Sequence, residues 1–409
     1  MSAFTRLFRL VFGGDVDRAL RPVLAVGLAG SIASATAYPF MGIWAIKHLS
    51  APQSSLAVTY LAGAVLAGGT GFLGGHVSDH IGRRPLILAG WGFQALVPLL
   101  LLSVGHHVYW GLALLAALPV FGSLGGAADQ AMVADLVAPE RREAAYASVR
   151  IAQNFGVTIG PVLGGALLIG GHWSHLWLGT LALGSIGFGI AYRYIPRGGA
   201  YAPEGPPQRG SFGVIMRDSP FLFFMLASVF ATMTYIATET LLPISVTTTH
   251  HLAPAAWGFL MILNPLLVTA LQLRLIRWTR SVRASIKLGL AMPMMGVPFL
   301  LLNVNGSASV IALVIVIFVF GEMLWVPTSQ AVVAALAPSD IRGAYMGVFG
   351  GTWSVGWAAT PFLGLTVRAA YGDATMWVCV ASVGVIAGVM GLAAARGHDA
   401  QAAAVGSLA

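Results

Sequence analysis

The sequence predicts an all-α membrane protein with twelve transmembrane helices in two pseudo-symmetric six-helix bundles. Three observations support this prediction: the composition, a series of long apolar segments and an internal repeat. The chain of 409 residues is 57% hydrophobic and only 9% charged, whereas a soluble globular domain carries about 25% charged residues. Lipid is therefore the expected solvent for most of the chain.

Each apolar segment is long enough to cross a bilayer, because a spanning helix needs about 20 apolar residues. The first six lie near 22–46, 55–76, 85–104, 109–137, 142–170 and 173–194, and the second six near 219–243, 255–276, 283–303, 307–336, 342–367 and 374–394. Residues 195–218 are rich in proline, glycine and arginine, which is typical of a linker. The predicted domains are therefore 1–194, a cytoplasmic linker 195–218, and 219–409 with a short cytoplasmic tail.

The distribution of arginine and lysine predicts the orientation, since these residues gather on the cytoplasmic side of a membrane. With an internal N-terminus, Lys47 and Arg368 fall outside, Arg150 falls within a span, and the other basic residues are cytoplasmic. A missed span would invert every later loop and destroy this bias. We therefore expect a multi-pass protein of the inner (plasma) membrane, with both termini in the cytoplasm.

The two halves of the sequence resemble each other. Phe121, Gln130, Tyr146, Pro161 and Gly164 recur as Phe320, Gln330, Tyr345, Pro361 and Gly364, at an offset of 199 to 200 residues. Parallel repeats of six helices, with a binding site between them, are an architecture of secondary transporters.

A short polar stretch, 75–84, separates the second and third apolar segments. It reads Gly-His-Val-Ser-Asp-His-Ile-Gly-Arg-Arg. Asp79 can accept hydrogen bonds at the start of the next helix, and the two arginines can pair with carboxylates at neighbouring helix ends. The alternative is a basic loop that only fixes orientation.

This stretch resembles the loop between helices 2 and 3 of the major facilitator superfamily, where the loop acts as a conformational latch. The resemblance gives that role to Gly75, Asp79, Gly82, Arg83 and Arg84. His80 stands where the family usually has a basic residue.

Asp135 lies near the cytoplasmic end of the fourth segment, at the depth of these arginines, and follows Ala131 in a spacing seen in related transporters. We expect Asp135 to pair with Arg83 in an outward-facing state and to separate from it in an inward-facing state. The alternative is a surface acid without a partner.

The fifth segment carries a second motif. Pro161 removes a backbone donor and can bend the helix, and glycines let another helix approach closely. The residues Gly156, Gly160, Pro161, Gly164 and Gly165 resemble the antiporter motif of helix 5 in drug/proton exchangers. Ala147 stands where the longer form of that motif has glycine. A kinked, tightly packed helix without a coupling role is the alternative.

Charges inside spans are costly and are usually paired or functional. Asp129 and Arg150 both lie about 12 Å from the cytoplasmic ends of neighbouring helices, by the helical rise per residue. We therefore predict that they form a pair, which either orders the first half or takes part in proton or substrate movement.

Glu322 lies about 21 Å from the cytoplasmic end of the tenth segment, and no arginine is predicted at its depth. Such an acid can bind either a proton or a cation, and it resembles an acid on helix 10 of some multidrug/proton antiporters. The alternative is a protonated glutamate that only packs between helices. Glu239 is predicted near the outer third of the seventh segment, where it lines the outer mouth or is merely interfacial. Aromatic residues on the same helices suit lipophilic or cationic substrates.

Several functions are not supported by the sequence. Lys47 and Lys287 are the only lysines and neither follows a glycine, so no phosphate-binding loop is present. The single cysteine, Cys379, permits no intrachain disulfide, and the net charge of +8 comes from basic residues at span ends rather than a nucleic-acid-binding face. No catalytic cluster or metal site is evident. We therefore expect no enzyme activity, cofactor, metal or nucleic-acid partner.

The resemblance to twelve-helix drug/proton antiporters implies proton-coupled efflux of lipophilic drugs, cationic ones among them, by alternating access. The expected partners are a small-molecule substrate, protons and the lipid bilayer, and we expect a monomer. Alternatives on the same fold are an exporter of a metabolite or sugar, or a lipid flippase. A membrane sensor or membrane-bound enzyme is a further alternative, although no output domain or catalytic cluster is evident.

Overall fold

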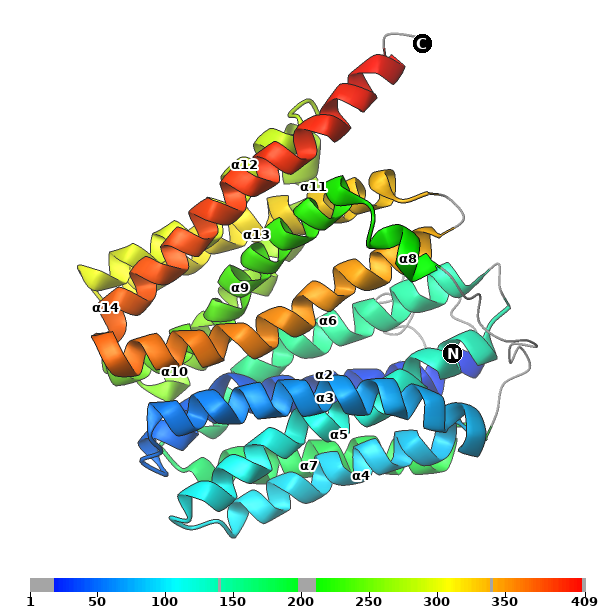
Figure 1. Cartoon of the computed structure of the whole chain (residues 1–409). Helices are drawn as coiled ribbons and strands as arrows, with labels where there is room; N and C mark the ends of the chain where they lie inside the picture. The colour runs from blue at the N-terminus through cyan, green and yellow to red at the C-terminus, as the bar shows by residue number, and fades with distance from the viewer. Residues whose placement is uncertain (1–17, 139–140, 198–210, 339–340, 407–409) are drawn as a thin grey trace. The chain divides into compact units, whose positions relative to one another are not determined.

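The fold is seen in a computed structural model, which describes residues 18–138, 141–197, 211–338 and 341–406. These residues form helices joined by short connections, and none of them forms a strand (Figure 1). Residues 198–210 of the predicted linker lie outside the described residues, and the linker ends with a short helix, α8 (Ser211–Ile215). The all-helical prediction is confirmed for the described part of the chain.

The chain divides into two compact units, each described separately below. Unit 1 comprises Met1–Ala51, Ala62–Gly205 and Ala253–Phe259, and unit 2 comprises Pro52–Leu61, Pro206–Leu252 and Leu260–Ala409. The helices of the first half begin with a 3-10 turn, η1 (Arg18–Leu20). They are α2 (Arg21–Lys47), α3 (Gln53–Ile81), α4 (Arg83–Leu102), α5 (Val108–Leu136), α6 (Arg142–Leu167) and α7 (Trp173–Tyr194). All six predicted spans of this half are present.

Glycines set the helix packing in unit 1. A Cβ atom added to Gly156 or Gly160 would lie 2.5 Å from the side chain of Ser31 or Ala35 on α2. On Gly164 it would lie 2.3 Å from the Thr36 carbonyl oxygen. The helices α6 and α2 therefore meet along a row of glycines, as the sequence motif predicts.

The next glycine of the motif faces a different partner. A Cβ atom on Gly165 would lie 3.1 Å from the Cα of Gly258 in α10 (Pro254–Leu260), which belongs to unit 1. Pro161 lies inside α6 and is buried, and its carbonyl oxygen also faces Gly258. The glycine motif of α6 is therefore closely packed, as predicted, and it contacts both α2 and α10.

The second half contains the remaining helices. They are α9 (Ser219–Thr248), α10, α11 (Leu263–Trp278), α12 (Ala284–Gly296), η3 (Val297–Asn303), α13 (Ala308–Leu336) and α14 (Arg342–Gly406). Two predicted spans, 255–276 and 283–303, are each built from two shorter helices. Pro265 and Pro298 explain these breaks, because a proline cannot donate a hydrogen bond to the carbonyl four residues earlier.

The long helix α14 contains two spans. Gly372 has a φ of +87° inside it, a left-handed conformation that favours glycine, and the chain turns there. The turn falls between the predicted spans 342–367 and 374–394. The second part continues to Gly406, beyond the predicted end.

Many helices of the described residues have the length and composition of a membrane span. Nine of their helices are long and apolar enough to cross a membrane, and one of these, Tyr345–Arg396, includes the turn at Gly372. Counting that helix as two spans and adding α3 and α6 gives the twelve spans that the sequence predicts.

The internal repeat is visible in the contacts of unit 2. Gly356 and Gly364 on α14 correspond to Gly156 and Gly164, and a Cβ atom on them would lie 2.8 Å from Thr232 and 2.3 Å from Leu241 of α9. Thr360 replaces Gly160, and its hydroxyl donates to the Met233 carbonyl over 3.2 Å. The same helix pair thus meets in both units through matching positions.

A buried polar network fixes the turn at Gly372 to α9. Arg368 Nε donates to Asp373 Oδ1 over 2.5 Å, and Arg368 Nη2 donates to the hydroxyls of Thr248 and Thr249 over 2.7 and 3.0 Å. The other oxygen of Asp373 accepts from Ser245 over 2.6 Å and from the Trp377 indole over 3.2 Å. The distribution of basic residues predicts Arg368 on the outer side of the membrane, but it does not predict the pairing of Arg368 with Asp373.

The α6–α2 contact predicts the effect of Gly160→Ala. Alanine is favoured over glycine in a helix by about 1 kcal/mol, but the added methyl group would lie within 2.8 Å of the α2 backbone. Overpacking of this kind costs about 1–3 kcal/mol. We expect a lower melting temperature in detergent.

Gly68→Ala on α3 is the matched control, because nothing lies within 4 Å of its added methyl group. Gly68→Ala is expected to keep or raise the melting temperature. Equal shifts for the two variants would contradict the assignment of Gly160 to a packing role.

The Arg368–Asp373 pair predicts a non-additive pair of substitutions. Arg368→Met leaves Asp373 buried without its cation, and breaking a buried ion pair in this way costs about 3–5 kcal/mol. Arg368→Met with Asp373→Asn removes both charges and is expected to be more stable than Arg368→Met alone. Thermal unfolding of the purified protein measures both, and a double variant no more stable than the single one would count against the pair.

Candidate functional site

The predicted latch pair is present in unit 1. Arg83, at the start of α4, donates from Nε to Oδ2 of Asp135, near the end of α5, over 3.2 Å. The two side chains are only 13% and 7% exposed. Arg83 Nη1 also donates to the hydroxyl of buried Ser78 over 2.7 Å. The predicted pairing of Arg83 with Asp135 is therefore confirmed as a contact.

The second arginine of the stretch contacts another helix. Arg84 Nη2 donates to the carbonyl oxygen of Tyr192 in α7 over 2.6 Å, and its guanidinium lies 6.0 Å from the Tyr192 ring centroid. Gly82 separates α3 from α4 with a φ of +90°, which explains the glycine at this position. Gly75 and Asp79 lie in α3, but the side chain of Asp79 is outside the described part of the structure, so the predicted latch role of both residues stays a prediction.

Glu322 and Glu239 lie close together in unit 2. Asn264 Nδ2 on α11 donates to Glu322 Oε2 on α13 over 2.6 Å. The Tyr235 hydroxyl on α9 lies next to the Glu322 carboxylate, and Glu239, one turn further along α9, is near enough to interact electrostatically with Glu322. No ion pair involves either glutamate among the described residues. The two acids thus share a site that contains no cationic side chain in this part of the chain.

Tyr235, which lies next to these acids, is part of an aromatic cluster. The Tyr235 ring centroid lies 5.0 Å from that of Trp353 on α14 and 6.2 Å from that of Trp325 on α13, and the two tryptophans are 5.8 Å apart. Tyr235 and Trp353 are half-buried. We call Tyr235, Glu239, Asn264, Glu322, Trp325 and Trp353 the acidic aromatic site.

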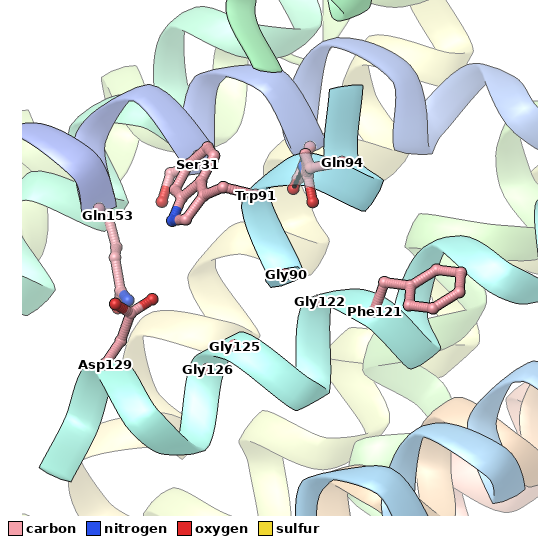
Figure 2. Close-up of a pocket in the computed structure, with 13 residues that line it drawn as sticks. Ser31, Gly90, Trp91, Gln94, Phe121, Gly122, Gly125, Gly126, Asp129 and Gln153 are labelled. Atoms are coloured by element: carbon pink, nitrogen blue, oxygen red, sulfur yellow. Dashed lines mark hydrogen bonds between the residues drawn. The ribbon is translucent and has the colours of Figure 1, made fainter. Parts of the chain in front are cut away.

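The predicted pair between Asp129 and Arg150 does not form in this structure. Arg150 is exposed, and Asp129 Oδ1 is buried without a hydrogen-bond partner. Equal depth along two helices does not fix the direction in which each side chain extends. Gln153, one turn further along α6, lies on the side of Asp129 instead (Figure 2).

Asp129 lines a cavity of 160 Å³ in unit 1. The cavity lies between α2, α4, α5 and α6, and Figure 2 shows the side chains around it. Its lining also includes Ser31, Gln94 and Gln153 and several glycines. Asp129 is the only charged residue in this lining.

Sequence reasoning missed Asn264 as the partner of Glu322. The available signal was an amide residue followed by Pro265 in the middle of an apolar segment. An isolated polar residue there calls for an intramembrane partner, and the proline marks the helix break that places Asn264 at the start of α11.

The sequence matches one protein family over most of its length and is similar to individual known transporters. A family model described as the Major Facilitator Superfamily matches residues 10–361. The chain is 20% identical over 385 residues to a Na⁺, Li⁺, K⁺/H⁺ antiporter of Planococcus maritimus, covering 86% of this chain and 89% of the relative. It is 25% identical over 338 residues to the multidrug resistance protein MdtH of Klebsiella pneumoniae, covering 78% and 79%.

Solved structures show the same fold. A bacterial homologue of the human lysosomal transporter Spinster, in an inward-facing and unoccupied conformation, superposes with a TM-score of 0.74 at 14% identity, covering 92% of this chain and 96% of that one. A peptide transporter in complex with sulfate superposes with a TM-score of 0.73 at 15% identity, covering 92% and 95%. With the family match over most of its length, the chain belongs to the Major Facilitator Superfamily and is a multi-pass membrane transporter rather than an enzyme.

Proposed function

We propose that this protein exports lipophilic, cationic compounds in exchange for protons. It acts in the inner (plasma) membrane with both termini in the cytoplasm, and its two six-helix bundles, residues 1–194 and 219–409, alternate access to the substrate. The observation that carries the proposal is the acidic aromatic site, where two carboxylates without a cationic partner lie beside three aromatic rings.

The chemistry of this site suits a lipophilic cation. Aromatic faces attract a cation through their quadrupole, and a nearby carboxylate adds direct charge attraction. Both effects strengthen where water is excluded. A neutral sugar would gain little from such a pair of acids.

The same carboxylates can couple transport to protons. A buried carboxylate without a cation is stabilised by taking up a proton, so a proton and a cationic substrate compete for Glu322. Arrival of a proton from outside favours release of the substrate there, and the proton then leaves to the cytoplasm. Asp129 is a second acid that can carry a proton in the first half.

The names of the relatives agree with this proposal. One is a multidrug resistance protein and another exchanges alkali cations for protons. The packed glycine motif of α6, from Gly156 to Gly165, is the sequence feature that points to exchange rather than cotransport.

Proton movement in everted vesicles or proteoliposomes tests the proposal. With an acid-inside gradient, adding a lipophilic cation is expected to cause proton efflux, and Glu322→Gln is expected to abolish this response because its amide cannot exchange a proton. Glu322→Asp, which keeps a titrating group, is expected to retain part of the signal.

Lipophilic cations, neutral drugs and sugars, added one at a time in the same assay, form a panel of substrates that separates the alternatives. Full proton-coupled transport by Glu322→Gln would contradict the role of this residue. Proton movement in response to a sugar or other metabolite, but not to cations, would identify a metabolite exporter. No proton movement with any compound would favour a lipid substrate.

The Arg83–Asp135 contact predicts a variant with intact binding and slow transport. We propose that this pair closes the cytoplasmic side and must break for the inward-facing state. Asp135→Asn removes a charge-assisted hydrogen bond, worth about 1.5–3 kcal/mol, from the state that is closed to the cytoplasm. Return to that state then becomes the slow step, and the maximal transport rate is expected to fall about tenfold or more, since each 1.4 kcal/mol corresponds to a factor of ten.

Substrate affinity in detergent is expected to stay unchanged, because the pair is not part of the acidic aromatic site. The charge-swapped double variant, Arg83→Asp with Asp135→Arg, restores the pair and should recover part of the rate. Loss of substrate binding in Asp135→Asn would instead indicate a role in folding or in the site itself.

A further inference from the structure

We propose that the cavity around Asp129 in unit 1 is a binding site for a monovalent alkali cation such as Na⁺, which exchanges there with a proton. The inference adds a ligand to those of the proposed export cycle. It stands whether or not Glu322 couples protons, because it rests on a separate set of residues.

The first argument is the state of Asp129. Its Oδ1 atom is buried and no described residue donates a hydrogen bond to it. Asp129 forms no ion pair with a described residue. Burying a carboxylate without a hydrogen-bond donor or a cation costs free energy within a membrane. Buried polar atoms in proteins almost always have a bonding partner, so the missing partner of Asp129 needs an explanation. A bound cation or a proton supplies that partner.

The second argument is the space beside the carboxylate. The cavity volume is 160 Å³, well above the roughly 10–15 Å³ that one water molecule requires on the same scale. A dehydrated or partly hydrated alkali cation therefore fits. Figure 2 shows Gln153 and Asp129 pointing toward one another from α6 and α5, with Ser31 and Gln94 on other sides of the same space.

The third argument is the choice of ligand atoms. Gln94 donates from Nε2 to the Ser34 hydroxyl over 2.8 Å, which leaves its carbonyl oxygen as an acceptor. Ser31 and Gln153 offer a hydroxyl and an amide oxygen. The lining contains no cysteine, histidine or methionine, so soft metals are disfavoured.

The charge of the site points to a monovalent ion. Asp129 supplies a single negative charge, and no other titratable or charged residue of α2, α4, α5 or α6 lines the cavity. The described residues contain no group of three His, Cys, Asp or Glu side chains that could hold a divalent metal. One carboxylate with neutral oxygen ligands balances one Na⁺, Li⁺ or K⁺.

The fourth argument comes from the glycines of the lining. Gly30 and Gly90 are needed for packing, because an added Cβ atom would approach Trp91 and Gly125 within 2.4 and 3.0 Å. Gly27, Gly122 and Gly126 are different, since an added Cβ atom would meet nothing within 4 Å. Helix packing therefore does not explain these three glycines, whereas an open cavity does.

Equilibrium binding of radioactive sodium to the purified protein in detergent tests the inference without any transport step. We expect saturable binding that Li⁺ and acid displace. Asp129→Asn is expected to weaken Na⁺ affinity by more than about a hundredfold and Gln153→Ala by about tenfold, in line with the effects of lost metal-site contacts. Gly126→Leu, which fills the cavity one turn from Asp129, should also weaken binding.

The matched control is Asp218→Asn, which changes an acid at the start of α9 that lies in neither proposed site and is expected to leave Na⁺ affinity unchanged. Thermal unfolding shows that each variant is folded. Absence of saturable binding of Na⁺, Li⁺ and K⁺ to the unmodified protein would overturn the inference, and so would unchanged binding by Asp129→Asn. Loss of binding in Asp218→Asn as strong as in Asp129→Asn would also overturn it, because the site would then not be confined to the Asp129 cavity.

Discussion

An ionised side chain in a membrane must find a partner, because lipid cannot replace the water that solvates it. The charged residues of this protein meet that constraint in three ways. Asp135 and Asp373 pair with Arg83 and Arg368. Glu322 is held by neutral groups, of which Asn264 is the closest defined donor. Asp129 has no partner among the described residues and faces a cavity. The paired acids are the ones to which we assign structural or gating roles, and the acids without a cation are the sites proposed for protons and cations.

Small residues hold together two matching pairs of helices, one in each unit. In unit 1 the glycines of α6 lie against the backbone of α2, and in unit 2 the matching positions of α14 lie against α9. Thr360 replaces one glycine and gains a hydrogen bond to the neighbouring backbone. Both solutions bring two helices close together where the hydrophobic effect cannot drive them, since lipid is as apolar as their side chains.

Much of this arrangement could be predicted from the sequence. Apolar segments located the helices because their length is set by the bilayer, and the Arg83–Asp135 pair followed from a motif with fixed spacing. The predicted Asp129–Arg150 pair does not form. Equal depth in the membrane does not determine on which side of its helix each residue lies, or in which direction a long arginine side chain extends. Asn264 was missed because the break between α10 and α11 lies inside a continuous apolar segment. The Arg368–Asp373 network depends on the turn at Gly372, which brings the two residues together in a way that composition alone does not reveal.

Proton release on substrate binding tests the central claim most directly, namely that a cationic substrate and a proton compete for Glu322. The purified protein in weakly buffered detergent solution is mixed with a lipophilic cation, and the pH change is recorded with an indicator dye. Competition predicts that binding releases protons from the unmodified protein, and that Glu322→Gln binds or fails to bind the cation without releasing any. Binding without proton release by the unmodified protein, or equal release by Glu322→Gln, would contradict the account.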